Sequence, residues 1–222
     1  MSEGPTRAPG RLLAIIVACV LIAALAFAIG RFTAFGASSA APVPNAADAG
    51  FARDMQVHHA QAVEMAMIEY GRTTDADLRS LAYDIATGQS AQKGEMYDWL
   101  VQWGLPQSGE ALMSWMVDAG GMAGHDGHAT TGAGSVEELE AAMGMATDAE
   151  LAALRDAQGI DADCTFLSLM IRHHEGAIAM VDRVRELGSV PRVIDVATSM
   201  AETQTAEVDA MRSFQARLAC SG

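Results

Sequence analysis

Apolar residues recur with the three- and four-residue spacing of an amphipathic helix in four long segments of this 222-residue chain. Glycine and proline fall mostly between these segments, where they end one helix or open the next. The pattern predicts an all-α protein whose long helices cover about 48–70, 74–103, 161–188 and 189–219.

The helix boundaries carry their own signals. Thr74, with Asp77 three residues later, predicts a capping box at the start of the second helix. Gly104 and Pro106 end that helix, and Pro191 opens the fourth. Short turns join the first helix to the second and the third to the fourth, which predicts two helical hairpins.

The first and third helices carry the same motif, 115 residues apart. Each copy has two adjacent histidines, with one methionine three residues before the first histidine and another seven residues after it. Because a helix turns by about 100° per residue, these positions share one face. The first copy comprises Met55, His58, His59, Ala62, Val63 and Met65, and the second comprises Met170, His173, His174, Ala177, Ile178 and Met180.

A looser repeat follows each motif, at an offset of 112. Its members are Gln92, Glu95 and Met96 in the first half and Gln204, Glu207 and Val208 in the second. Two similar hairpins predict a four-helix bundle whose duplicated faces meet across a pseudo-two-fold axis. Four polar side chains are expected to support the histidines by hydrogen bonds: Gln92, Glu95, Gln204 and Glu207.

Two imidazoles on a buried stripe must each find a hydrogen-bond partner or a metal ion. Adjacent histidines point about 100° apart, so they converge on one ion only if a second helix closes the space between them. Imidazole with thioether suits copper, above all Cu(I), better than a hard cation. The predicted ligands are His58, His59, His173, His174, Met55, Met65, Met170 and Met180, and not all eight can bind one ion.

The alternative for the histidines is a metal-free polar core, in which the imidazoles bond only to the nearby glutamine and glutamate side chains. Methionines elsewhere in the helices are interpreted as ordinary core residues.

An uncharged run of eighteen residues, Leu12 to Ile29, lies near the amino terminus. As a helix it would be about 27 Å long, close to the thickness of a bilayer core. It predicts a transmembrane anchor over 12–31, a cytoplasmic segment over 1–11, a linker over 32–47 and a bundle domain over 48–220 outside the cell membrane. A secreted protein released by signal cleavage is the alternative.

Residues 105–159 form an insertion between the hairpins that is rich in methionine and glycine. A short helix is expected over 109–118, and capping boxes predict further short helices after Ser135 and Thr147. Long insertions in compact domains are usually either functional or disordered. Five residues of the insertion are candidates for auxiliary metal ligands: Met122, His125, His128, Met143 and Met145.

The formal net charge of −14 belongs almost entirely to the chain beyond the amino-terminal run, which argues against a nucleic-acid partner. Two cysteines, Cys164 and Cys220, lie outside that run. They predict a disulfide in an oxidising compartment, because antiparallel third and fourth helices bring the start of one close to the end of the other.

The chain resembles the ferritin-like domains known as domain of unknown function 305. The resemblance covers roughly 49–218. It rests on the His58-His59 copy, on the segment Met143-Gly144-Met145-Ala146-Thr147-Asp148-Ala149-Glu150, and on Phe166, Met170, Ile171, His173, His174, Gly176, Ala177, Ile178 and Met180. Members of this family are often exported or membrane-tethered in bacteria, and some bind copper through histidine and methionine. The resemblance implies a ferritin-like four-helix bundle with a role in copper handling.

Together these features predict a membrane-anchored, extracytoplasmic protein that sequesters copper, confers resistance to it or passes it to a partner. Iron or another transition metal is the alternative cofactor. A metal-dependent redox enzyme and a metal-free interaction module are the alternative functions. A non-catalytic role is favoured, because no hydrolase motif pairs a nucleophile with a histidine and the Glu-x-x-His signature of di-iron bundles is absent from the sequence.

Overall fold

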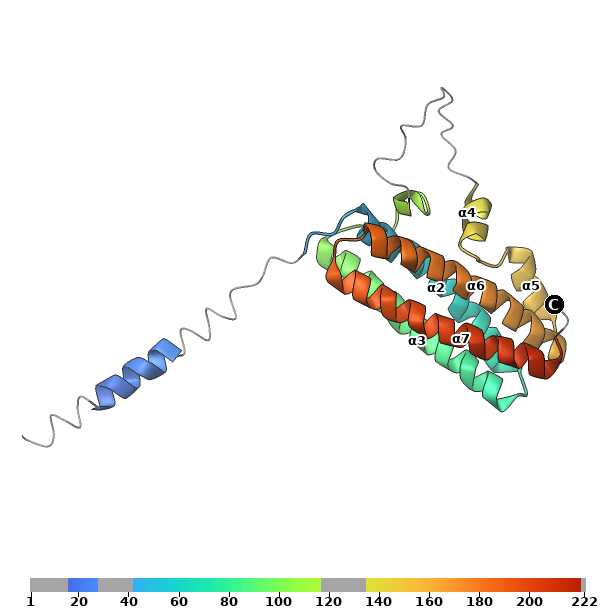
Figure 1. Cartoon of the computed structure of the whole chain (residues 1–222), viewed down its shortest axis with the longest axis horizontal. Helices are drawn as coiled ribbons and strands as arrows, with labels where there is room; N and C mark the ends of the chain where they lie inside the picture. The colour runs from blue at the N-terminus through green and yellow to red at the C-terminus, as the bar shows by residue number, and fades with distance from the viewer. Residues whose placement is uncertain (1–15, 28–41, 117–134, 221–222) are drawn as a thin grey trace, which may run out of the picture. The chain divides into compact units, whose positions relative to one another are not determined.

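The computed structural model describes residues 16–27, 42–116 and 135–220, and every regular element in these ranges is helical (Figure 1). The chain divides into two units, Met1–Pro42 and Val43–Gly222, which we describe separately. The predicted all-α class is confirmed for the described part of the chain.

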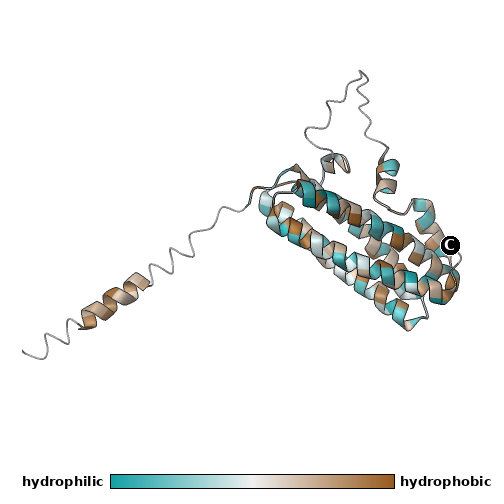
Figure 2. Ribbon diagram, viewed as in Figure 1, coloured by the Kyte–Doolittle hydropathy of each residue, from teal (hydrophilic) through white to brown (hydrophobic). Residues whose placement is uncertain are grey.

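In the amino-terminal unit, residues 16–27 form a helix of mostly hydrophobic residues (Figure 2). Its side chains are exposed. This helix lies inside the predicted anchor, whose remaining residues, 12–15 and 28–31, fall outside the described ranges. Among the described helices, none is both long enough and apolar enough to cross a bilayer. The predicted transmembrane helix is therefore not supported by the described residues.

Four long helices of the second unit lie side by side in a bundle (Figure 1). They are α2 (Ala46–Arg72), α3 (Ala76–Trp103), α6 (Ile160–Leu187) and α7 (Pro191–Leu218). α2 and α3 form one hairpin, α6 and α7 form the other, and α2 packs against α6. The two predicted hairpins are confirmed, and they meet through the helices that carry the histidine motifs.

The long helices of the first hairpin begin and end at residues that favour helix caps, and one predicted cap differs from the observed one. Asn45 opens α2 in a capping box with Asp48, and Gly104 ends α3 in the left-handed conformation at a φ of 66°. The predicted cap at Thr74 is wrong, because Asp75 caps α3 and its carboxylate accepts two backbone N–H groups of the first turn. Aspartate and threonine are both favourable caps, so residue type could not separate these neighbours.

The described part of the insertion contains three short helices: the 3-10 turn η1 (Ser114–Met116), α4 (Val136–Ala142) and α5 (Asp148–Asp156). Ser135 and Thr147 cap α4 and α5 through capping boxes, as predicted. Of the helix expected over 109–118, the described residues show only η1.

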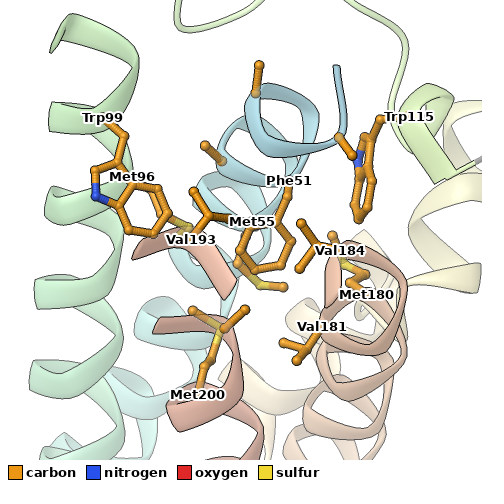
Figure 3. Packing of buried hydrophobic residues seen from close by; sticks show 14 of the residues in the cluster. Phe51, Met55, Met96, Trp99, Trp115, Met180, Val181, Val184, Val193 and Met200 are labelled. Atoms are coloured by element: carbon orange, nitrogen blue, oxygen red, sulfur yellow. The ribbon is translucent and has the colours of Figure 1, made fainter. Parts of the chain in front are cut away.

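The bundle interior holds two apolar clusters, one toward each end. The first joins Phe51, near the start of α2, to Val184, near the end of α6 (Figure 3). The second joins Ala66, late in α2, to Phe166, early in α6. These pairings show that α2 and α6 run antiparallel, so the duplicated motifs cross at the middle of the bundle.

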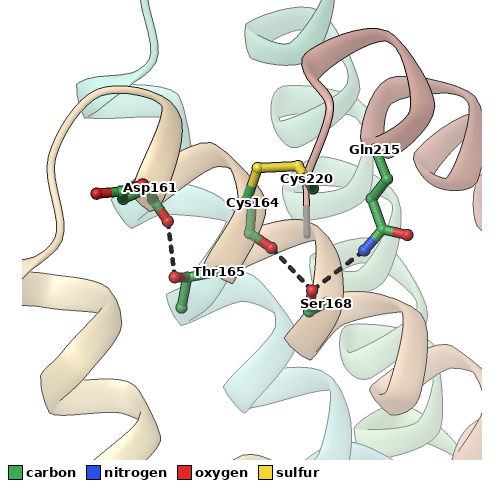
Figure 4. The surroundings of a disulfide bond; sticks show 6 residues. All are labelled: Asp161, Cys164, Thr165, Ser168, Gln215 and Cys220. Atoms are coloured by element: carbon green, nitrogen blue, oxygen red, sulfur yellow. Dashed lines mark hydrogen bonds between the residues drawn. A yellow bond between two sulfur atoms is a disulfide. The ribbon is translucent and has the colours of Figure 1, made fainter. Parts of the chain in front are cut away.

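Cys164 and Cys220 form a disulfide, as predicted (Figure 4). Their Cα atoms are 5.5 Å apart, and the bond joins the first turn of α6 to the end of α7. One turn along α6, the hydroxyl of Ser168 accepts a hydrogen bond from Nε2 of Gln215 at 3.1 Å. Both interactions fix the open end of the second hairpin.

Candidate metal centre

The four histidines of the motif lie at the centre of the bundle, and all four side chains are fully buried. The rings of His58 and His173 stack across the α2–α6 contact, with centroids 3.6 Å apart. Within each pair the rings are further apart, at 6.2 Å for His58 and His59 and 6.3 Å for His173 and His174. The two motif faces therefore meet inside the bundle, as the spacing predicts.

The second histidine of each pair bonds a side chain on the other helix of its hairpin. Nε2 of His59 donates to Oε1 of Gln92, and Nε2 of His174 donates to Oε2 of Glu207, both at 2.8 Å. Each bond joins residues 33 apart, so Gln92 corresponds to Glu207 and the repeat offset is 115 in both hairpins. The offset of 112 is wrong by one helical turn, because similar side chains recur every three residues on α3 and α7.

The first histidine of each pair bonds the main chain instead. Nε2 of His58 donates to the carbonyl oxygen of Met143 at 3.0 Å. Nε2 of His173 donates to the carbonyl oxygen of His58 at 3.1 Å, which ties α6 to α2. Such oxygens only accept hydrogen bonds, so they hold the protons of these two rings on Nε2.

With the Nε2 of each ring engaged in a hydrogen bond, Nδ1 is the atom that a neutral ring offers to a metal ion. These four Nδ1 atoms are buried, and none has a hydrogen-bond partner among the described residues. A buried acceptor without a partner is costly. Histidines that bind metals commonly donate their other ring N–H to a carbonyl or carboxylate, which orients the ring. The observed arrangement has this form, and the donor set therefore fits a metal ion.

Three of the rings, those of His58, His59 and His173, are also held in the neutral form that binds metals. Burial lowers the pKa of His58 to about 4 and that of His59 to about 3, because desolvation disfavours a charged ring. Burial lowers the pKa of His173 well below its ordinary value, and the neighbouring His58 adds to this shift. No proton therefore competes with a metal ion at these three rings near pH 7.

The predicted thioether ligands are all buried as well. They fall into two groups because α2 and α6 run antiparallel. Met55 and Met180 belong to the first apolar cluster, and Met65 and Met170 belong to the second. One methionine from each repeat thus lies on either side of the histidine layer, and Figure 3 shows Met55 and Met180 in the first cluster.

The histidines do not form a complete cage by themselves. Within the described ranges, no three side chains among His, Cys, Asp and Glu converge closely enough to hold one ion. The rings of His58 and His173 stack on one another with their planes 30° apart. The buried thioethers of the motif are further candidate donors beside the four rings.

Two of the four polar residues expected to support the histidines do so, and two do not. Glu95 pairs with Arg192 of α7, at 2.9 Å to its Nε. The side-chain amide of Gln204 is buried but bonds none of the described residues. Gln89, which precedes Gln204 by 115 residues, is also buried, and its amide also bonds none of the described residues. Gln89 is not among the residues predicted from the sequence. Aligning the second helix of each hairpin at the same offset of 115 as the histidine motifs pairs Gln89 with Gln204.

A strap of residues 143–146 crosses the α2–α6 pair and completes the surroundings of His58. Its close approach depends on Gly176 of α6, where a Cβ would lie 1.9 Å from the carbonyl oxygen of Met143. The side chain of Gln61 anchors the strap by donating to the carbonyl of Ala146 and accepting its N–H, at 2.8 and 2.7 Å. The strap thereby holds a backbone carbonyl against a buried imidazole.

Two of the candidate auxiliary ligands, Met143 and Met145, belong to this region and are buried in the first cluster. The other three, Met122, His125 and His128, lie outside the described residues.

A comparison with known protein families identifies the family of this helical bundle. The profile of a domain of unknown function, DUF305, matches residues 48–215. The chain belongs to the DUF305 family. The family predicted from the motifs is thus confirmed. No curated protein matches the chain.

Solved structures similar to this chain include two DUF305 proteins and CopM. An inferred secreted protein from Streptomyces coelicolor is 38% identical, with a TM-score of 0.66 over 79% of this chain and 94% of that one. A fragment from Deinococcus radiodurans is 30% identical, with a TM-score of 0.64 over 79% and 99%. CopM in a Cu(II)-bound form is 26% identical, with a TM-score of 0.57 over 77% and 96%. A protein of similar fold has therefore been observed with copper.

Proposed function

We propose that this DUF305 protein binds copper between its two hairpins and sequesters the ion or passes it on outside the cytoplasm. The observation that carries the proposal is the set of four buried Nδ1 atoms without hydrogen-bond partners among the described residues, each on a ring whose Nε2 is already hydrogen-bonded. The ligands come from His58, His59, His173 and His174, which offer nitrogen, and from Met55, Met65, Met170 and Met180, which offer sulfur; one ion binds a subset of the eight.

Copper is the metal that best suits this donor set. Hard cations prefer oxygen, whereas imidazole and thioether together favour copper and in particular Cu(I). The solved forms of CopM support the choice, because they include Cu(I)-bound and silver-bound structures as well as the Cu(II)-bound one. Silver(I) is also a soft ion, so the neighbouring fold accommodates the same class of ligand chemistry.

A competition titration of the full-length chain with a chromophoric Cu(I) chelator tests the proposal. Replacing His58→Ala together with His173→Ala is expected to weaken Cu(I) binding by more than about tenfold, because two nitrogen donors are lost. Equal affinity in the parent and the variant would contradict the proposal. Circular dichroism of both proteins establishes that the variant keeps its helices.

A second variant tests the contribution of the methionine sulfur atoms while keeping the side-chain volume nearly constant. Met55→Leu with Met170→Leu removes one thioether from each side of the histidine layer and is expected to weaken Cu(I) binding without unfolding the bundle. Met200→Leu is the matched control, since Met200 is equally buried in the first cluster but lies outside the motif. An equal loss of affinity in both would argue against thioether ligation.

We also propose that the amino-terminal apolar run tethers the bundle to the cell membrane. Its support is the uncharged stretch Leu12 to Ile29 with its flanking arginines. Fractionation of cells that express the full chain tests this point. Recovery of the protein in the membrane fraction, resistant to salt washing, is expected, and recovery in the soluble extracytoplasmic fraction would contradict it.

A further inference from the structure

Two buried glutamines have no assigned role in the centre described above. Gln89 on α3 is 4% exposed and Gln204 on α7 is 2% exposed. Neither the oxygen nor the nitrogen of either amide has a hydrogen-bond partner among the described residues. A buried amide without partners destabilises a protein, so two such amides at equivalent positions of a repeat call for a ligand.

The register of each hairpin places these amides next to the histidine layer. His59 on α2 faces Gln92 on α3. Because the two helices run in opposite directions, the residue three positions after His59 faces the residue three positions before Gln92. Gln89 therefore comes opposite Ala62. In the second hairpin the bond of His174 to Glu207 places Gln204 opposite Ala177 by the same count.

The alanines at these positions leave room beside the amides. Ala62 and Ala177 are fully buried, and each lies one helical turn along its helix from the histidine pair. Ala177 belongs to the first apolar cluster and Ala62 to the second, so one glutamine flanks the histidine layer on each side. Each amide thus shares its side of the layer with one of the two methionine pairs.

The chemistry that the amides add is oxygen donation. Cu(I) is satisfied by imidazole and thioether, whereas Cu(II) prefers nitrogen and oxygen ligands in a tetragonal arrangement. An amide oxygen is neutral and does not titrate, so its contribution does not depend on pH. Beside donors of nitrogen and sulfur, two buried amides offer oxygen, for which the oxidised ion has the stronger preference.

We propose that Gln89 and Gln204 are specificity-determining residues of the copper centre, whose amide oxygens favour Cu(II) and have little influence on Cu(I). The inference rests on the proposed copper-binding function. It assigns to these two residues the ability of one bundle to hold copper in both oxidation states.

The test compares the full-length chain with a variant that carries Gln89→Leu and Gln204→Leu. Competition with a Cu(II) chelator and with a Cu(I) chelator gives the two affinities separately. Cu(II) binding is expected to weaken by about tenfold or more and Cu(I) binding by less than about threefold, so the reduction potential of bound copper rises by about 59 mV for each tenfold difference. Unchanged Cu(II) affinity, or an equal loss of both affinities, would overturn the inference.

Two further measurements separate this role from a structural one. The melting temperature of the metal-free Leu variant is expected to rise, because unpartnered amides are replaced by apolar side chains; a fall would contradict the absence of partners. Gln89→Glu with Gln204→Glu keeps an oxygen at each position and is expected to retain parental Cu(II) affinity. The two hairpins already differ in this way at one pair of equivalent positions, because the first has Gln92 where the second has Glu207.

Gln215→Leu is the matched control, because Gln215 lies on α7 and bonds Ser168 near the disulfide, away from the histidines. It is expected to leave both copper affinities unchanged. If the parent chain binds copper in neither oxidation state, the proposed function itself fails. If the parent binds both and the Leu variant matches it, the proposed function stands and the role of the glutamines is refuted.

Discussion

The imidazole of His173 stacks on that of His58 and, through its Nε2, donates a hydrogen bond to the carbonyl oxygen of the same residue. The two hairpins are therefore joined at the very residues that would bind the metal. Protonating either ring would place a positive charge against its neighbour in a buried site, which desolvation also opposes. Folding of the bundle and preparation of neutral ligands are thus consequences of the same contact.

Gly176 is predicted to be required for the strap that holds His58. Gly176→Ala places a Cβ against the carbonyl oxygen of Met143, so the strap must move and the bond from His58 lengthens or breaks. We expect a loss of about 2–3 kcal/mol in the free energy of unfolding, measured by urea denaturation.

The matched control is Gly88→Ala in α3. A Cβ at Gly88 meets nothing within 4 Å, so alanine should stabilise the helix by about 0.5–1 kcal/mol. Similar effects of the two substitutions would show that the strap does not depend on close approach at Gly176.

Glu69 predicts a loss of stability as the pH rises from about 4.5 to about 8. It is fully buried late in α2, and burial raises its pKa to about 8, with the carboxylates of Asp163 and Asp75 adding to the shift. In the unfolded chain the pKa is close to 4.5. Between these values the native state holds more protons than the unfolded state, so stability is complete below about pH 4.5 and falls as pH rises through 8.

Glu69→Gln removes this dependence. The variant is expected to lose less stability than the parent between pH 5 and pH 9, with a difference on the order of a few kcal/mol in the free energy of unfolding. The charged groups that face Glu69 are Asp163 and Asp75, and Asp75 is paired with Arg217 in both proteins. Parallel stability curves for the two proteins would contradict the assigned protonation of Glu69.

The disulfide is predicted to contribute strongly to stability. Cys164 and Cys220 are separated by 56 positions, and closing a loop of that size stabilises a fold by about 4 kcal/mol on the chain-entropy estimate. Cys164→Ser with Cys220→Ser should lower the urea midpoint by a corresponding amount. The reduced parent serves as the comparison, and a midpoint equal to that of the oxidised parent would show that helix packing alone fixes this end of the bundle.

Gln92 is predicted to tune metal affinity through His59. Gln92→Leu removes the acceptor that keeps the proton of His59 on Nε2, so the ring is free to turn or change tautomer. Cu(I) affinity is expected to fall by about 10–100-fold, as for other groups that orient a metal ligand. Gln102→Leu, an exposed glutamine on the same helix, is the control and should leave the affinity unchanged.

Sequence periodicity was sufficient for the helices and for the inward direction of both histidine pairs. The motif repeats at a fixed offset, and an apolar stripe on a helix has few ways to be buried. The offset of the second repeat was wrong because Gln89, Gln92 and Glu95 are one turn apart, so three alignments look alike. Hydrogen bonds to His59 and His174 decide between them.

The strap and the tautomers could not be predicted from residue spacing. The bond from His58 goes to a main-chain carbonyl, and every residue has such a carbonyl, so Met143 carries no distinguishing side-chain signal for this role. The close approach at Gly176 is likewise a property of two segments that are distant in sequence. Only a three-dimensional arrangement relates them.

Nitrogen-15 NMR of histidine-labelled protein tests the central claim most directly, because it distinguishes Nδ1 from Nε2 in each ring. In the metal-free protein the rings of His58, His59 and His173 should be neutral, and all four buried rings should carry a proton on Nε2. On addition of diamagnetic Cu(I), the Nδ1 resonances of His58, His59, His173 and His174 should shift while the Nε2 protons persist. Shifts at Nε2, or no change at these four rings while copper binds elsewhere, would contradict the account.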